Sequence, residues 1–503
     1  MSETLGSLLH GFALLASPDI LLYAVVGCIV GTLVGVLPGV GPLAGMSLLL
    51  PVTFGLDPTK SLILLSGIFY GAMYGGSTTS ILMRIPGEAA SVVTCLDGYA
   101  MARQGRAGAA LAIVAFGSFF AGTAGVVALM LVAPTLGAWA LKFGPPEYFA
   151  ILVLGLLVLC SMSSGPILNA LAMALLGLAL GLVGLDRMTG FLRFDYGVPE
   201  LGDGLGVVPV AVGLFGIGEL LAAAGAATRP EVIEPKLREL LPTREELRRS
   251  LAPTGRGTLI GFFLGLLPGP APIVSTFVSY GIERRLSRHP ERFGQGAVEG
   301  VAGPESANNA ATTSAFIPML SLGVPTGPAT AIVMAALMIH GVTPGPTLIR
   351  EQPDLFWTFV ASMYFGNLVL LVLNLPLVGI FVNLLRIRYA ILYPFILLFC
   401  VVGIYGIGSS AVDLWIMAIA GLGGYLLRKL GFDLAPIVLG LVLAPLFELA
   451  LRQSLVMSRG SYAIFVDRTL TAALLGAGLL VVLASIASQI LRRRASLTAA
   501  MDA

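Results

Sequence analysis

Residues 27–42 read GCIVGTLVGVLPGVGP, and residues 257–272 read GTLIGFFLGLLPGPAP. Both segments carry a glycine at every fourth position, run into Leu-Pro-Gly and end on a further proline. The glycines are Gly27, Gly31, Gly35 and Gly39 in the first glycine stripe, and Gly257, Gly261, Gly265 and Gly269 in the second. Two such segments about 230 residues apart indicate an internal duplication.

Glycines four residues apart form one smooth stripe along a helix, on which a second membrane helix can lie closely. The Leu-Pro-Gly that follows ends the helix, because proline lacks an N–H and glycine lets the chain turn away. We therefore expect helix breaks at Pro38 and Gly39 and at Pro268 and Gly269. Breaks at matching places in two halves of a membrane protein are the best sequence indication of a transporter's binding site.

The composition indicates an integral membrane protein built of helices. Hydrophobic residues make up 57% of the chain, charged residues make up 11%, and the mean hydropathy is +0.94. Eleven apolar stretches lie between residues 20 and 491, and several are long enough to be split. We expect an all-α polytopic protein with roughly 11 to 14 membrane segments, each about 20 residues long.

One long polar stretch divides the two copies. We assign residues 1–228 to a first transmembrane repeat, 229–256 to a polar linker, and 257–503 to a second repeat with C-terminal helices. Within the linker, Thr243 followed by acidic residues predicts the start of a short surface helix. The positive-inside rule places the linker in the cytoplasm, and Arg492, Arg493 and Arg494 place the C-terminal end there too.

A second group of basic residues also favours the cytoplasm, although only the apolar stretch 257–281 separates it from the linker. These residues are Arg284, Arg285, Arg288 and Arg292. A hairpin that enters the membrane, breaks at Pro268 and returns to the same side satisfies both positions. We expect such a re-entrant hairpin over 257–281 and a similar one over 27–50, meeting near the membrane midplane.

About forty residues after each break comes a group of hydroxyl and amide residues that ends in Thr-Thr-Ser and is followed by proline. Hydroxyls, amides and free N–H groups at a helix start bind a carboxylate without a full positive charge, while freed carbonyls bind Na⁺. The alternative is that these side chains only bond to their own helix. We predict substrate binding by Ser77, Thr78 and Thr79 of the first hydroxyl cluster and by Asn308, Asn309, Thr312 and Thr313 of the second.

Few charges stand beside these clusters. Arg84 follows the first cluster and is predicted to attract a substrate carboxylate, while Glu305 precedes the second and is suited to carrying a proton or a cation. Both positions also suit residues that extend to the membrane surface. Residues 96–103 resemble an ordinary basic loop, and Asp433 has no assigned role.

Several function classes are excluded by what the sequence lacks. The net charge of +2 gives no case for nucleic acid, and Lys60-Ser61 follows Thr59 rather than the glycine of a phosphate-binding loop. Three widely separated histidines give no metal cluster or catalytic triad. The sequence predicts a protein that is not an enzyme, has no cofactor and draws energy from an ion gradient.

The chain resembles the large membrane subunit of the tripartite tricarboxylate transporters, the TctA family. The resemblance lies in Gly31 to Gly39, in the loop from Asp97 to Gly108, in Gly303-Pro304-Glu305-Ser306-Ala307-Asn308-Asn309-Ala310, and in Gly431 to Arg452. The segment Pro-Glu-Ser-Ala-Asn-Asn is the most specific part. The resemblance covers nearly the whole chain.

This resemblance implies a symporter of the bacterial inner membrane for tricarboxylates such as citrate or related organic anions. It implies two partners, a small membrane subunit and a periplasmic solute-binding protein, and coupling to Na⁺ or H⁺. Where Na⁺ is the coupling ion, we expect it near Asn309 and freed backbone carbonyls. Still open are an autonomous permease, an intramembrane enzyme, inverted or parallel halves, and elevator or rocking movement.

Overall fold

The computed structural model describes residues 2–37, 41–163, 165–186, 188–223, 233, 241–384 and 389–501. These residues form an all-α protein, as predicted, and their only strands are β1 (Gly184–Leu185) and β2 (Leu192–Arg193), which pair antiparallel. The first half contains α1 (Ser2–Leu15), α2 (Pro18–Val36), α3 (Gly41–Leu49), η1 (Pro51–Gly55), α4 (Pro58–Met83), η2 (Ala89–Val92), α5 (Thr94–Met101), η3 (Ala102–Arg106), α6 (Ala107–Ala140), α7 (Pro145–Met162), α8 (Ile167–Leu180), η4 (Pro199–Asp203), α9 (Val207–Ala211), η5 (Val212–Ile217) and α10 (Gly218–Ala223).

The second half is helical in the same way. It contains α11 (Arg244–Gly265), α12 (Ala271–Leu286), η7 (Pro290–Arg292), α13 (Glu299–Ser314), α14 (Phe316–Leu322), α15 (Pro328–Ile339), α16 (Leu348–Glu351), α17 (Pro353–Asn374), α18 (Val378–Leu384), α19 (Tyr389–Gly408), α20 (Ala411–Lys429), α21 (Ala435–Met457), α22 (Ile464–Asp467) and α23 (Thr469–Met501). Several of these helices are shorter than a membrane is thick, since each residue advances a helix by only about 1.5 Å.

Seven helices in the described chain are long and apolar enough to cross a membrane, and five more are apolar but shorter. The protein is therefore a multi-pass membrane protein. The short apolar helices include Gly41–Gly55 and Pro328–Ile339, which begin just after breaks in the chain. Broken helices of this kind explain why the sequence shows more apolar segments than the structure has full-length spans.

The first glycine stripe brings α2 against α4. A Cβ atom built on Gly31 would lie 2.6 Å from the carbonyl oxygen of Ile68, and one on Gly27 would lie 2.8 Å from that of Leu64. Real Cβ atoms essentially never approach backbone so closely. Only glycine permits this packing, as expected for a small-residue stripe between membrane helices.

The second glycine stripe brings α11 against α13 in the same way. Cβ atoms on Gly257 and Gly261 would collide with the carbonyl oxygens of Gly303 and Ala307, and one on Gly265 would collide with Ala311. In both halves, therefore, the arm before the break lies along the helix that carries a hydroxyl cluster. The predicted broken hairpins are present as α2–α3 and α11–α12.

The start of α11 differs in length from the prediction. Thr243 caps it as predicted, in a capping box with Glu246, but the helix is not a short surface element. It continues without interruption from Arg244 to Gly265, so residues 244–256 of the expected linker share a helix with the second glycine stripe. Most of the remaining linker, 229–232 and 234–240, lies outside the described residues.

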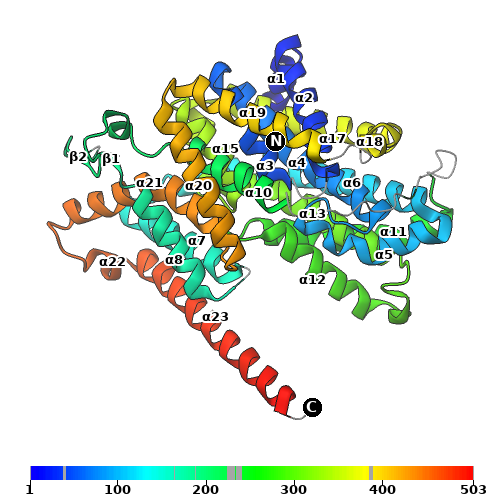
Figure 1. The fold of residues 1–503 in the computed structure, drawn as a ribbon. Coiled ribbons are helices and arrows are strands. Elements are labelled where there is room, and N and C mark those ends of the chain that lie inside the picture. Colours follow the sequence, from blue (N-terminus) through cyan, green and yellow to red (C-terminus); the bar gives the residue numbers. More distant parts are fainter. Residues whose placement is uncertain are drawn as a thin grey trace.

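The helices form two groups that lie on opposite sides of Figure 1. On one side α8 and α7 pack against α21, and α23 packs on α7; on the other, α2 packs on α4 while α13 lies between α11, α12 and α6. Helix α17 joins the second group by packing against α6, α4 and α1. A cavity lined by residues from both groups lies at their boundary.

Candidate functional site

A cavity of about 630 Å³ lies at the meeting point of the two hairpin tips. We call it the central cavity. Its lining from the hairpins is Gly41, Pro42, Leu43 and Ala44 in the first copy and Gly269, Pro270, Ala271, Pro272 and Ile273 in the second. Two further segments complete this wall, residues 86–90, which run from the loop after α4 into η2, and residues 326–330, which run into the start of α15. The far wall comes from α7 and from the α20–α21 connection, including Arg428 and Asp433.

The second helix break is shaped by Gly269. Its φ is 144°, a conformation that side-chain-bearing residues rarely adopt, and a Cβ there would lie 2.5 Å from the sulfur of Met162. The freed N–H of Gly269 donates to the carbonyl oxygen of Thr326 at 2.7 Å. Pro268 precedes this turn, as predicted. At the first break α2 ends at Val36, while Pro38 and Gly39 lie outside the described residues.

Two helices begin at the cavity wall. The first residues of α12, Ala271 to Ile273, and of α15, Pro328 to Thr330, line it. The first N–H groups of a helix have no partner inside the helix and make its start electropositive. Such helix starts are favourable places for a carboxylate.

The hydroxyl clusters do not lie at helix starts, contrary to the expectation from the sequence. They occupy the last turns of α4 and α13, and none of the seven predicted residues lines the central cavity. All seven are at most 4% exposed. Three of their hydroxyls donate to backbone carbonyls: Thr79 to Val36 at 2.8 Å, Thr312 to Asn308 at 2.9 Å, and Thr313 to Asn309 at 3.0 Å.

Arg84 is also away from the cavity. It is exposed, has a left-handed backbone with φ 57° at the end of α4, and its guanidinium lies 5.9 Å from the centre of the Tyr99 ring. The end of α4 therefore points this cation toward Tyr99 and not toward the residues that line the cavity.

Glu305 brings the two clusters together. Its carboxylate accepts hydrogen bonds from Ser77 at 2.6 Å, Thr94 at 3.1 Å and Asn309 at 3.3 Å, and Asn309 also donates to Ser118 at 2.7 Å. Glu305 is 0% exposed and has no ion pair within the described part of the chain. A buried carboxylate with no cation beside it is costly unless it holds a proton or an ion.

Glu88 was missed in the sequence, although it directly follows the Pro86-Gly87 that marks the end of the first cluster. It lines the central cavity at 7% exposure. Asp433, which had no predicted role, lines the opposite wall, where it accepts a hydrogen bond from Ser163 at 2.7 Å and caps α21 through Ala435. The signal for Glu88 was its place beside a helix break.

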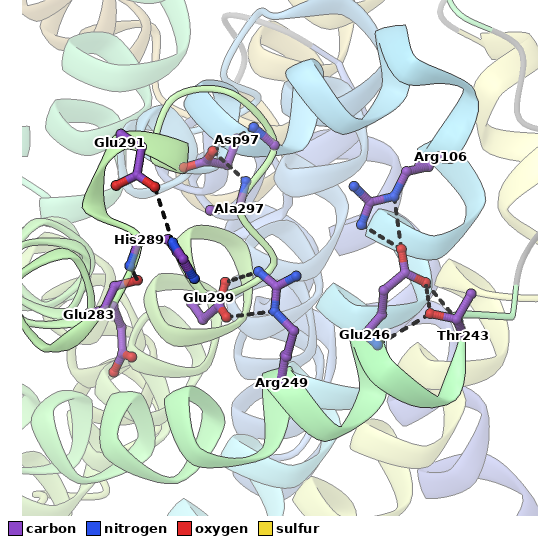
Figure 2. A network of polar contacts seen from close by, with 12 residues as sticks. Asp97, Arg106, Thr243, Glu246, Arg249, Glu283, His289, Glu291, Ala297 and Glu299 are labelled. Carbon is purple, nitrogen blue, oxygen red and sulfur yellow. Dashed lines mark hydrogen bonds and ion pairs between the residues drawn. The ribbon is translucent and has the colours of Figure 1, made fainter.

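Ion pairs outside the cavity hold the second hairpin to its neighbours (Figure 2). Glu246 of α11 pairs with Arg106 at 2.8 Å, and Arg249 pairs with Glu299 of α13 through two bonds of 2.8 Å. Asp97, which the sequence placed in an ordinary basic loop, is instead fully buried in α5. These contacts fix α11, α13 and α5 relative to one another.

Residues 21–439 match the model of a known family, described as the tripartite tricarboxylate transporter TctA family. The chain is 48% identical over 494 residues to an uncharacterized 52.8 kDa protein in the TAR-I ttuC' 3' region of Agrobacterium vitis, covering 98% of each chain. It is 45% identical over 234 residues to an uncharacterized protein in the TAR-II ttuC' 3' region of the same organism, covering 46% of this chain and 97% of that one. No solved structure matches the chain.

Proposed function

Since the chain belongs to the tripartite tricarboxylate transporter TctA family, we propose that it is the large permease subunit of an ion-coupled symporter for tricarboxylates or related organic anions. Its partners in this proposal are a small membrane subunit and a periplasmic solute-binding protein. Its place is the bacterial inner membrane. The observation that carries the proposal is the convergence of two broken hairpins and two helix starts on one cavity.

The central cavity suits an organic anion. The starts of α12 and α15 offer unpaired N–H groups, and Arg428 adds one cation on the opposite wall. A volume of about 630 Å³ falls in the ordinary range for small-molecule sites, which is about 300 to 1,000 Å³. Substrate bound there would touch both hairpin tips.

The predicted hydroxyl and amide residues serve the coupling ion in this proposal. Ser77 and Asn309 reach Glu305 directly, and Asn308 is fully buried with no hydrogen-bond partner for its amide atoms among the described residues. Two hydroxyls and the amide nitrogen of Asn309 donate to the Glu305 carboxylate, which in this proposal binds either H⁺ or Na⁺. The remaining cluster residues, Thr78, Thr79, Thr312 and Thr313, shape the helix ends around it.

Uptake into proteoliposomes tests this function. The chain is reconstituted with its two proposed partners, the small membrane subunit and the binding protein. Accumulation of radiolabelled citrate is measured with an inward Na⁺ gradient, with an inward proton gradient and with neither. Accumulation that needs a gradient and all three proteins is expected. Accumulation by the chain alone would indicate an autonomous permease, and no accumulation of citrate or of a panel of related organic acids would reject the proposal.

A further inference from the structure

The carboxylate of Glu88 is only half satisfied. Its Oε2 accepts a hydrogen bond from the backbone N–H of Ala90 and so caps η2. Its Oε1 has no hydrogen-bond partner in the described chain, although the side chain is 93% buried. Glu88 packs against Gly76, where any Cβ would lie 2.7 Å from the Glu88 side chain. This packing holds the carboxylate at the cavity wall.

No ion pair with this carboxylate is present in the described chain, and the one cation of the cavity lining, Arg428, lies on the far wall. The elements that pack against η2 are α4, α5, α12 and α13. Their titratable side chains are Lys60, Tyr70 and Tyr74 of α4; Cys95, Asp97 and Tyr99 of α5; Tyr280, Glu283, Arg284 and Arg285 of α12; and Glu299 and Glu305 of α13. The loop before η2 adds Arg84, and the far wall of the cavity adds Arg428 and Asp433.

The cations in this set are engaged or distant. Lys60 pairs with Asp19 and Asp57 at the start of α4, which is about 35 Å from that helix's other end. The arginines of α12 lie in its last turn, while its first turn is the part that lines the cavity. Arg84 lies over Tyr99. None forms an ion pair with Glu88 in the described chain.

A second buried carboxylate lies on a neighbouring helix. Glu305 is fully buried on α13, which packs against η2, and it accepts a hydrogen bond from Ser77, the residue next to the Gly76 against which Glu88 packs. Two buried carboxylates near one another do not both ionise readily. A carboxylate of an incoming organic anion would add a third negative charge to the same region.

We propose that Glu88 binds a proton on its unpartnered oxygen when an organic anion occupies the central cavity beside it, so that the anion meets a neutral carboxylic acid rather than a carboxylate. This inference rests on the proposed function and adds a proton to its coupling. The proton comes from water on the side where the anion enters, travels on Glu88, and is released to water on the other side after the anion leaves. No bond other than this O–H bond forms or breaks.

The variant that isolates this step is Glu88→Gln. Its amide keeps the cap on η2, through the side-chain oxygen, and is neutral like the carboxylic acid, but it cannot titrate. Wild-type citrate uptake is expected to fall about tenfold per pH unit once Glu88 ionises, as for any single-proton requirement. Uptake by Glu88→Gln is expected to vary less than about twofold over the same pH range, after correction for the change in the charge state of citrate. It is also expected to carry one proton fewer per anion.

Asp433→Asn is the matched control, because it removes the same charge from the opposite wall of the same cavity. Both oxygens of Asp433 already accept hydrogen bonds, from Ser163 and Ala435, so its protonation is not required. Uptake by Asp433→Asn is expected to fall with rising pH as wild-type uptake does. Since all three proteins meet the same mixture of citrate species, any difference between them reports the protein.

Equal pH profiles and equal proton counts in wild type and Glu88→Gln would overturn the inference. If no protein transports citrate at any pH, the proposed function fails, and Glu88 is then judged by infrared difference spectroscopy of the purified chain between acidic and alkaline buffers. A carboxylic-acid band present in wild type and absent in Glu88→Gln supports the proton site. Identical spectra reject it.

Discussion

At the scale of single residues, Glu305 is where the two hydroxyl clusters meet. Its carboxylate accepts hydrogen bonds from Ser77 of the first cluster and from Asn309 of the second, and Ser77 lies 228 positions from Glu305 in sequence. A hydrogen bond to a charged group contributes about 1.5 to 3 kcal/mol. Loss of one such donor should therefore change the affinity of this carboxylate for its ion by about tenfold or more, because the donor stabilises the ionised form.

We predict that Asn309→Ala reduces ion-dependent uptake at least about tenfold while the protein remains in the membrane. The change removes a donor to Glu305 and another to Ser118. The measurement is uptake as a function of Na⁺ and of pH, normalised to the amount of reconstituted protein. Unchanged transport would remove Asn309 from the ion site.

Asn374→Ala is the control for this experiment. Asn374 is equally well buried, at 5% exposure, and its amide donates to the backbone of Leu370 and to Thr32, away from Glu305. The Asn374→Ala variant loses a buried amide of the same size as the one that Asn309→Ala loses. A similar loss of uptake in both variants would mean that the defect is one of folding.

At the scale of elements, the glycine stripes act by permitting backbone to approach backbone. Gly261 and Gly255 lie in the same helix, but they face different surroundings. A Cβ at Gly261 would collide with the carbonyl of Ala307, whereas a Cβ at Gly255 would meet nothing within 4 Å. This pair separates helix propensity from interhelical packing.

We predict opposite effects of alanine at these two positions. Gly255→Ala should raise the thermal unfolding temperature, because alanine favours a helix over glycine by about 1 kcal/mol. Gly261→Ala should lower it, because overpacking costs about 1 to 3 kcal/mol. Unfolding in detergent, followed by circular dichroism or an intrinsic fluorescence signal, gives both values; equal shifts would contradict the role of the stripe.

The break at Gly269 gives a prediction about function. Gly269→Ala forces a side chain into a left-handed backbone with φ 144° and against Met162, so we expect uptake to fall strongly through distortion of the cavity wall. Gly294→Ala, at φ 84° with open space around it, imposes similar backbone strain elsewhere. Uptake should be nearly normal in the latter variant, and comparable losses would argue against a special role for Gly269.

The breaks were predictable because proline and glycine act locally. Pro268 and Gly269 end the helix because proline lacks an N–H and glycine lets the chain turn away. The glycine stripe indicates that a partner helix lies close by. The placement of the hydroxyl clusters was not predictable in this way, because it depends on where α4 and α13 end. The far wall of the cavity, with Arg428 and Asp433, comes from helices about 160 residues further on and leaves no local signal.

At the scale of the whole molecule, Asp97 ties the first half to the second. One of its carboxylate oxygens accepts the N–H groups of Gly294, Gly296 and Ala297 at 2.7 to 2.8 Å, and the other accepts the hydroxyl of Tyr280 at 3.0 Å. The residue is fully buried. It therefore fixes the α12–α13 connection onto α5.

We predict that Asp97→Ala destabilises the protein by about 3 kcal/mol or more, since it leaves several buried donors unpaired. Tyr280→Phe, which removes one donor and leaves the carboxylate its three backbone partners, should cost about 1 kcal/mol. Denaturant or thermal unfolding in a fixed detergent measures both. Equal costs would show that the backbone bonds to Asp97 contribute little.

These buried hydrogen bonds determine which rigid-body motions of the molecule cost little free energy. A rotation of one half against the other would have to pull Asp97 from its backbone partners and Glu305 from Ser77, all in the buried interior. A displacement of both hairpins together with α4, α5 and α13 breaks neither set of contacts. The central cavity lies between this joined block and a wall made of α7 and the α20–α21 connection. In the proposed function, a substrate held by the hairpin tips would therefore move with the block relative to that wall.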